Sequence, residues 1–332
     1  KLKKWIKRGN NEIGDTVGIG ADITTIRTVS NSIFVIDPIT ASEKTYIETG
    51  CSSHLNGALA RCIIFSIFPT WQSYVIKQTI LTHANSLCIY SSWLSVFICR
   101  SILKQDKLPD DIFTSKNIFI KNRLKQFNKY EIIYLMNYNN INEQLNLLKL
   151  GYDNIKYVLK SLGCVFYAYN AIKLYETTNK TNNETTNEIT NETTNETTNE
   201  TNNETTNETN NETTDETTNE TNNETTDETT NETNNETTNE TTNETINETI
   251  NETINETIDE TNSKKTEMFK KRLLAVINQG GDTNTNGAIT GSLLGCYIGY
   301  NNLPKRWLER LKNKKWLDVK LIDLFKKIIV VQ

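Results

Sequence analysis

The sequence lacks several features that would place it in a common class of protein. Its six cysteines include no pair at the short spacing of a zinc site, and most lie within apolar runs: Cys51, Cys62, Cys88, Cys99, Cys164 and Cys296. This pattern predicts free buried thiols in a reducing compartment. The apolar run from Leu87 to Cys99 is shorter than the roughly 20 residues that cross a bilayer, and no secretory signal is evident. We therefore expect an intracellular, cytoplasmic protein without a membrane partner.

Alternating polar and apolar residues, the pattern of a half-buried strand, are also scarce along the chain. Apolar residues instead recur at helical spacing, for example after a cap at Asn85 or Ser86 and again within residues 152–175. The sequence therefore predicts an all-α fold.

Charged residues are distributed unevenly. Residues 176–262 repeat Asn-Glu-Thr-Thr in a register of four and hold 24 of the 41 acidic residues but one basic residue, Lys180. The rest of the chain therefore carries 17 acidic and 35 basic residues, a formal charge of +18. This positive charge indicates either solvated surface lysines, which are the commoner case, or an anionic ligand.

The repeat has almost no apolar side chain, and its glutamates repel one another at i and i+4. Such a segment cannot offset the entropy lost on ordering. We therefore predict a disordered insertion at 176–262 between two parts of one helical domain, 1–175 and 263–332. Two alternatives stay open: a glycosylated stalk, since each Asn-Glu-Thr triplet is a formal acceptor, and a charged spacer that is itself the working part.

The most informative stretch is 279–299, which combines a glycine turn, an oxygen-rich loop and a helix. Gly280 and Gly281 end the preceding helical pattern. Asn286 is the expected N-cap of the helix that follows. Three residues of the loop offer hard oxygen ligands for a metal ion: Asp282, Asn284 and Thr285. The helix carries a stripe that predicts close approach of another backbone: Gly287, Gly291, Gly295 and Gly299.

Two polar residues of the first half have apolar neighbours or precede an apolar helix. Arg61 follows an expected cap at Asn56 and Gly57, and it either meets a buried carboxylate or ligand phosphate or extends to solvent. His83 precedes a predicted helix N-terminus, where backbone donors favour anions, although a lone histidine is more often structural. The pattern alone leaves both alternatives open.

Three separate segments of the sequence resemble motifs of the same protein family. They are Gly-Gly-Asp-Thr-Asn-Thr-Asn at 280–286 with Leu-Pro-Lys-Arg-Trp-Leu at 303–308, Asn-Gly-Ala-Leu-Ala-Arg at 56–61, and Thr82-His83. The first resembles Gly-Gly-Asp-Thr-Asp-Thr-Asn, the C-terminal signature of the ADP-ribosylglycohydrolase family. The others look like its Asn-Gly-Ala-Leu-Met-Arg loop and its Thr-His pair. Glu12-Ile13-Gly14 is similar to an Asp-Ile-Gly segment of the dinitrogenase-reductase-activating branch.

This resemblance implies a compact helical domain with a two-magnesium centre that hydrolyses the bond between ADP-ribose and a protein side chain. Carried over by position, it implies magnesium ligands at Asp282, Asn284 and Thr285. It also implies a set of substrate-binding residues: Asn56, Gly57, His83, Gly280, Gly281 and Glu12. The implied partner is an ADP-ribosylated protein or ADP-ribose, rather than a nucleic acid.

Two departures from the family pattern concern the metal site. Asn284 stands where the family has its second aspartate, and because an amide brings no charge we expect one magnesium ion or a weakly bound pair. The family's acidic Thr-Asp-Asp-Thr cluster precedes its Trp…Ile-Gly segment, and nothing before Trp5 supplies it. We therefore expect about half of a metal site, and the alternative to an enzyme is an inactive homologue that binds ADP-ribose.

Overall fold

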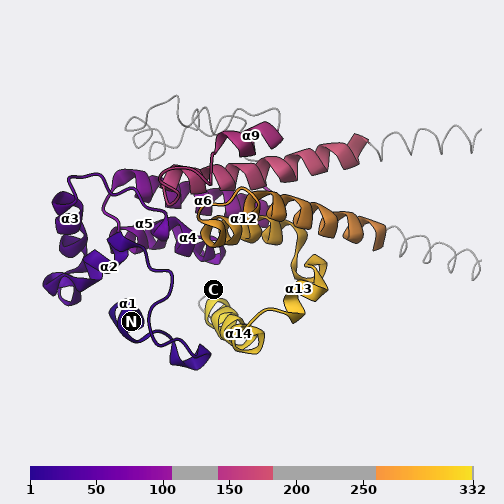
Figure 1. Ribbon diagram of the computed structural model, residues 1–332. Helices are drawn as coiled ribbons and strands as arrows, with labels where there is room; N and C mark the ends of the chain where they lie inside the picture. Colours follow the sequence, from indigo (N-terminus) through magenta and orange to yellow (C-terminus); the bar gives the residue numbers. More distant parts are fainter. Residues whose placement is uncertain (107–140, 182–258, 331–332) are drawn as a thin grey trace, which may run out of the picture. The chain divides into compact units, whose positions relative to one another are not determined.

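The computed structural model describes residues 1–106, 141–181 and 259–330, and the regular elements in these ranges are all helical (Figure 1). Within them no strand occurs, and an isolated bridge joins Leu55 to Tyr157. The predicted all-α fold is therefore confirmed. The contacts divide the chain into two units, residues 1–173 with 264–332 and residues 174–263. The elements that follow belong to the first unit, apart from residues 174–181 and 259–263 at the ends of two helices, which belong to the second.

The helices have the following bounds, where η denotes a 3-10 helix: α1 (Leu2–Arg8), η1 (Asn11–Ile13), α2 (Ile23–Ser30), η2 (Ser32–Val35), α3 (Pro38–Glu48), α4 (Gly57–Cys62), η3 (Ile63–Ile67), α5 (Trp71–Ile80), α6 (Ser86–Lys104), α9 (Ile141–Leu147), α12 (Thr283–Ile298), η4 (Tyr300–Asn302), α13 (Lys305–Glu309) and α14 (Lys314–Val330). Two further helices cover residues 158–181 and 259–277. The helices predicted after Asn85 or Ser86, within residues 152–175 and before Gly280 are thus present.

The predicted insertion at 176–262 falls mostly outside the described residues. Its described ends, 176–181 and 259–262, are helical. The boundaries and the disorder of the insertion stay predictions.

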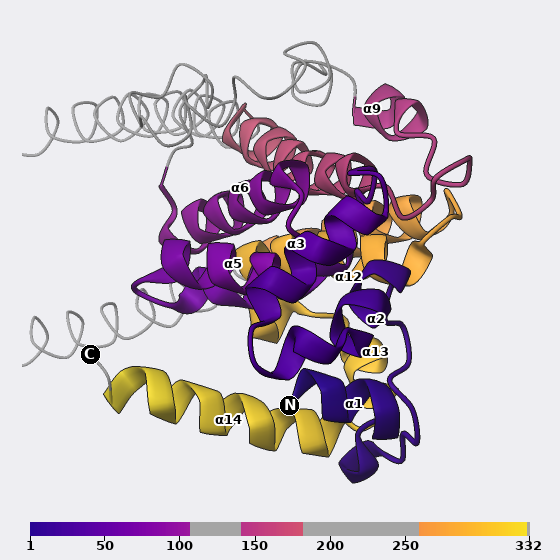
Figure 2. The same ribbon diagram turned by 90° about the vertical axis from the view of Figure 1, so that its left-hand side faces the viewer.

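The central helix of the first unit is α6, which packs against α4, α5, η3 and α12. Asn85 caps it, as predicted, by accepting a hydrogen bond from the Leu87 amide at 2.7 Å. In both views the residues 158–173 run beside α6 (Figure 1, Figure 2). By length and composition α6 could cross a membrane, but 67% of its apolar window is buried in this structure. That degree of burial is what a core helix requires.

The glycine stripe of α12 receives side chains from the helix at 259–277. A Cβ at Gly287 would lie 3.4 Å from Ile277 Cγ1, and one at Gly291 would lie 3.6 Å from Leu273 Cδ2. These are ordinary or slightly tight contacts with flexible side chains, so the expected close approach of another backbone along the stripe was wrong. The stripe makes room for apolar side chains of the neighbouring helix.

Close backbone contact occurs instead at the turn before α12. Gly280 and Gly281 have φ angles of 76° and 71°, which a residue with a side chain rarely adopts. A Cβ on Gly281 would overlap the carbonyl oxygen of Leu150, and one on Gly151 would lie 2.6 Å from the carbonyl oxygen of Gln279. The two glycines therefore let the chain turn against residues 150–151 and enter α12 at Thr283.

We expect Gly281→Ala to lower the free energy of unfolding by about 2–4 kcal/mol, because it combines a left-handed φ with an overlap against backbone. Urea unfolding of the whole chain measures this. Gly291→Ala is the matched control: its φ is helical and its neighbour is a leucine side chain, so the change should stay within about 1 kcal/mol and favour folding. Equal effects of both substitutions would contradict this explanation of the turn.

Candidate functional site

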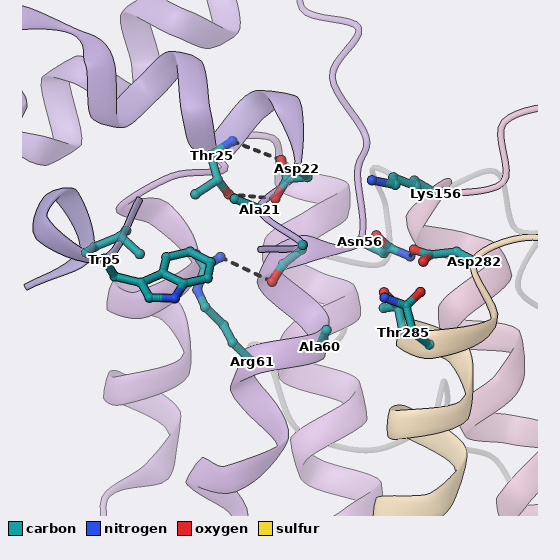
Figure 3. Close-up of a pocket in the computed structure, with 14 residues that line it drawn as sticks. Trp5, Ala21, Asp22, Thr25, Asn56, Ala60, Arg61, Lys156, Asp282 and Thr285 are labelled. Carbon is teal, nitrogen blue, oxygen red and sulfur yellow. Dashed lines mark hydrogen bonds between the residues drawn. The ribbon is translucent and has the colours of Figure 1, made fainter. Parts of the chain in front are cut away.

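A pocket of about 420 Å³ lies where α2, α4 and α12 begin (Figure 3). Its charged and polar lining comes from segments far apart in the sequence: Asp22, Asn56, Arg61, Lys156, Asp282 and Thr285. Asn284 and Gly57 line it too. Five residues expected at the site from the sequence therefore meet in one place, namely Asn56, Gly57, Asp282, Asn284 and Thr285.

The side-chain amide of Asn56 joins the three segments that form the floor of this pocket. Its two hydrogens go to Asp282 Oδ2 at 2.9 Å and to Ser161 Oγ at 2.8 Å. Ser161 in turn donates to Asn286 Oδ1 at 2.7 Å. All four residues are buried, with Asn56 only 2% exposed. Because both amide hydrogens of Asn56 are used, the Asp282 carboxylate is held in a fixed orientation.

Backbone contacts fix Asn56 itself. The backbone N–H of Asn56 donates to the Lys156 carbonyl at 3.0 Å, and the backbone N–H of Val158 donates to the His54 carbonyl at 2.9 Å. The residues 54–56 are thus paired with 156–158. Asn56 occupies the cap position of α4, as predicted, but its side chain makes no capping hydrogen bond. The N-cap of α12 is Asp282 rather than the predicted Asn286, which lies in the first turn.

Asp22 is a second carboxylate of the pocket, and the sequence reasoning missed it. It is 4% exposed and caps α2, accepting from the Thr25 amide at 2.9 Å and the Thr25 hydroxyl at 2.6 Å. A Cβ on Gly57 would overlap the Asp22 carboxylate, so Gly57 lets this acid reach the pocket wall. Residues 21–24, Ala-Asp-Ile-Thr, keep the second and fourth letters of Thr-Asp-Asp-Thr. This partial match lies after Trp5, whereas the acidic cluster was expected before Trp5.

His83 supports Asp22 from beneath the pocket rather than lining it. It is 1% exposed, and its Nε2 lies 3.4 Å from Asp22 Oδ1. Its Nδ1 lies 2.8 Å from the Thr82 hydroxyl. Burial raises the pKa of the Asp22 carboxyl, but the contacts with His83 and Thr25 lower it by a larger amount. The pKa of Asp22 is therefore well below its usual range. Asp22 is therefore ionised at neutral pH.

Arg61 occupies one wall of the pocket, and neither alternative left open by its sequence position describes it fully. Its guanidinium donates to the Gly57 carbonyl at 3.2 Å, to the Gln78 carbonyl at 2.9 Å and to the Thr82 hydroxyl. These acceptors are neutral, so Arg61 keeps its positive charge facing the pocket while it joins α4 to the end of α5. A half-buried cation with neutral hydrogen-bond partners suits an anionic ligand.

The remaining predicted site residues lie elsewhere. Glu12 is exposed, and its carboxylate accepts a hydrogen bond from Trp316 Nε1 at 2.5 Å and pairs with Lys320 at 2.9 Å. It joins η1 to α14 and does not line the pocket. Gly280 and Gly281 do not line the pocket either. Glycine is needed at these positions for the tight turn against residues 150–151.

The oxygens of the pocket have the chemistry of a magnesium site. Asp282, Asn284 and Thr285 offer a carboxylate, an amide and a hydroxyl from the start of α12, and Asp22 adds a second carboxylate. The part of the chain that the structure describes contains no group of three or more His, Cys, Asp or Glu side chains that could hold an ion. With two carboxylates, neutral oxygens and water to complete an octahedron, the donor set fits a single hard cation.

We expect Asp22→Asn to lower the free energy of unfolding at pH 7 by roughly 2–3 kcal/mol, because Thr25 and His83 lose a charged partner. The folded pKa of Asp22 lies below its unfolded value, so its contribution is fully present above about pH 4 and is lost as pH falls through the folded pKa. Urea unfolding between pH 7 and pH 2 should show the two proteins converging at low pH. If the difference in free energy of unfolding between the two proteins did not depend on pH, ionised Asp22 would not be its cause.

Comparison with known proteins places the chain in one family. The sequence profile of the ADP-ribosylglycohydrolase family matches residues 161–331, about half of the chain. This range begins at Ser161 of the buried network and includes the whole of α12.

Individual relatives match over shorter stretches. A Rhodospirillum rubrum protein named ADP-ribosyl-(dinitrogen reductase) glycohydrolase is 43% identical over 49 residues, which are 15% of this chain and 17% of the relative. A protein provisionally named ADP-ribosyl glycohydrolase, from Acanthamoeba polyphaga mimivirus, is 36% identical over 50 residues, 15% of each chain. The matched part spans about a sixth of each relative's length. No solved structure gives a significant match. The profile match over half of the chain confirms the resemblance: the chain belongs to the ADP-ribosylglycohydrolase family.

Proposed function

We propose that the protein is a magnesium-dependent ADP-ribosylglycohydrolase that hydrolyses the bond between ADP-ribose and a protein side chain. The observation that carries this proposal is the meeting of two carboxylates, Asp22 and Asp282, in one pocket of a chain of this family. The chain therefore holds more of an acidic site than the residues before Trp5 suggested.

A magnesium ion bound by Asp22, Asp282 and Thr285 would polarise a ribose hydroxyl and lower the pKa of a water molecule. The protein's own contribution is to orient both carboxylates. Asn56 fixes Asp282, and Thr25 with His83 fixes Asp22. Since Asp22 has a lowered pKa, it serves as an anion that stabilises positive charge developing on the ribose, rather than as a general acid.

Two cations of the pocket suit the diphosphate of ADP-ribose. Arg61 faces the pocket with neutral partners, and Lys156 lines the opposite side near Asn56 and Asp282 (Figure 3). Together their two positive charges offset the two negative charges of Asp22 and Asp282, so a dianionic ligand approaches a pocket with no net negative charge. Lys156 is half-buried, and its long flexible side chain suits contact with a phosphate.

A second candidate is an inactive homologue that binds ADP-ribose. The observation that favours it is that two family acids are replaced: Asn284 lines the pocket, and Ile23, beside Asp22, is 52% exposed. Binding of ADP-ribose by calorimetry without any turnover would identify this case.

The proposed activity predicts magnesium-dependent release of ADP-ribose from an ADP-ribosylated protein, measured by chromatography of the released nucleotide. Asp282→Asn should reduce the rate by roughly 100-fold or more, because it removes a charge that acts in the transition state. Asp37→Asn, an exposed cap of α3, is the control and should leave the rate unchanged. No release at any magnesium concentration would rule out the active enzyme.

For Lys156 we expect the alanine variant to bind ADP-ribose roughly tenfold more weakly, because it loses a charged phosphate contact. Calorimetry with ADP-ribose and with ribose alone separates a phosphate contact from a general loss of folding. Lys77→Ala, an exposed lysine on α5, should bind both ligands as the unmodified protein does. Equal weakening towards ribose would contradict a phosphate contact.

A further inference from the structure

Two cysteines that are 197 positions apart in the sequence lie next to each other in the first unit. The Sγ atoms of Cys99, on α6, and Cys296, on α12, are 3.6 Å apart. Both are free thiols in this structure, and the sequence indicated only separate buried thiols. A disulfide has an S–S bond of about 2.05 Å, so the sulfurs need to approach by roughly 1.5 Å. Rotation of the two side chains supplies a movement of this size.

The two thiols differ in their surroundings. Cys99 is fully buried, and Ser66 Oγ lies 3.5 Å from its sulfur. Cys296 is partly exposed, so a small oxidant reaches it first. The contact with the Cys296 thiol lowers the pKa of Cys99, and the same contact with burial raises the pKa of Cys296. Cys99 is thus the sulfur that more readily carries the negative charge of a nucleophile.

We propose that Cys99 and Cys296 are a redox modification site that forms a reversible disulfide between α6 and α12 when the protein meets a peroxide. A thiolate and not a thiol attacks peroxide, so Cys296 first passes its proton to the Cys99 thiolate 3.6 Å away. The Cys296 thiolate attacks hydrogen peroxide and the O–O bond breaks, which gives a sulfenic acid on Cys296. The released hydroxide takes the proton back from Cys99 and leaves as one water. The Cys99 thiolate then attacks the Cys296 sulfur, the S–O bond breaks, and the oxygen leaves as a second water after taking up a proton. Two thiols are oxidised, and one peroxide is reduced to two waters.

The bond would join α12, whose first turn lines the pocket, to α6, which follows the segment that contacts Asp22. Residues Thr82 and His83 come directly before α6 and support Asp22, and α12 starts with Thr283 after Asp282. The cross-link would also close a loop of about 200 residues, which restricts the unfolded chain strongly. Oxidation therefore makes the connection between α6 and α12 covalent and reduces local opening of α12. This proposal does not rest on the proposed function.

The test treats the whole chain carrying Cys51→Ser with dilute hydrogen peroxide, since Cys51 is exposed and would form intermolecular disulfides. Peptide mapping by mass spectrometry should find one linked pair, Cys99 with Cys296, that dithiothreitol reverses. The melting temperature should rise by roughly 5–10 °C on oxidation and return on reduction. Cys99→Ser and Cys296→Ser should each abolish the linked peptide and the shift. Cys164→Ser, a buried cysteine on another helix, should keep both.

Hydrogen exchange of residues 283–298 tests the effect on α12 without any assay of activity. Slower exchange in the oxidised protein, absent in Cys99→Ser, would support the proposal. Sulfenic or sulfinic acid on Cys296 with no linked peptide would overturn it. A linked peptide without slower exchange would overturn the part that concerns α12.

Discussion

The pocket depends on one buried side chain, the amide of Asn56. Its two hydrogens bind Asp282 and Ser161, and so they tie residues near 56, 161 and 282 into one network. Because each partner is buried, removing the amide would leave Asp282 and Ser161 without a donor, and water could not fully replace it. The helical fold thus brings the ends of α4 and α12 together, but this amide decides where the Asp282 carboxylate points.

Asp22, the other carboxylate of the pocket, is also held in place by buried polar neighbours. A carboxylate that is 4% exposed is costly unless its surroundings compensate its charge. Thr25 donates two hydrogen bonds to it, and His83 Nε2 lies 3.4 Å from its Oδ1. The absence of a side chain at Gly57 gives the carboxylate its space. Arg61 and Lys156 then balance the charge of the two acids. Charged and polar side chains therefore line the pocket beside the apolar residues Leu2, Trp5, Ala21 and Ala60, and the charged ones suit the proposed metal ion and dinucleotide-sized anion.

Much of this could be predicted from the sequence, and the limits have physical reasons. The helical repeat of α6 and the loop at 280–286 are local patterns, so the helix, its cap at one of two neighbouring residues and the pocket residues Asp282 and Thr285 could be predicted directly. Asp22 was missed because its identity as a site residue depends on contacts with Gly57 and His83, which are distant in the sequence. Glu12 was placed by position in a motif, yet its partner Lys320 lies at the opposite end of the chain. The spacing of the glycines in α12 likewise does not reveal whether side chains or backbone of a neighbouring segment pack against them.

The central claim is that Asp22 and Asp282 hold one divalent cation in a single pocket. Crystals of the protein soaked in manganese, which stands in for magnesium and scatters anomalously, test it most directly. The account predicts one anomalous peak within about 2.5 Å of carboxylate oxygens from both Asp22 and Asp282. A peak bound only elsewhere on the protein, or no peak in this pocket at millimolar manganese, would contradict it.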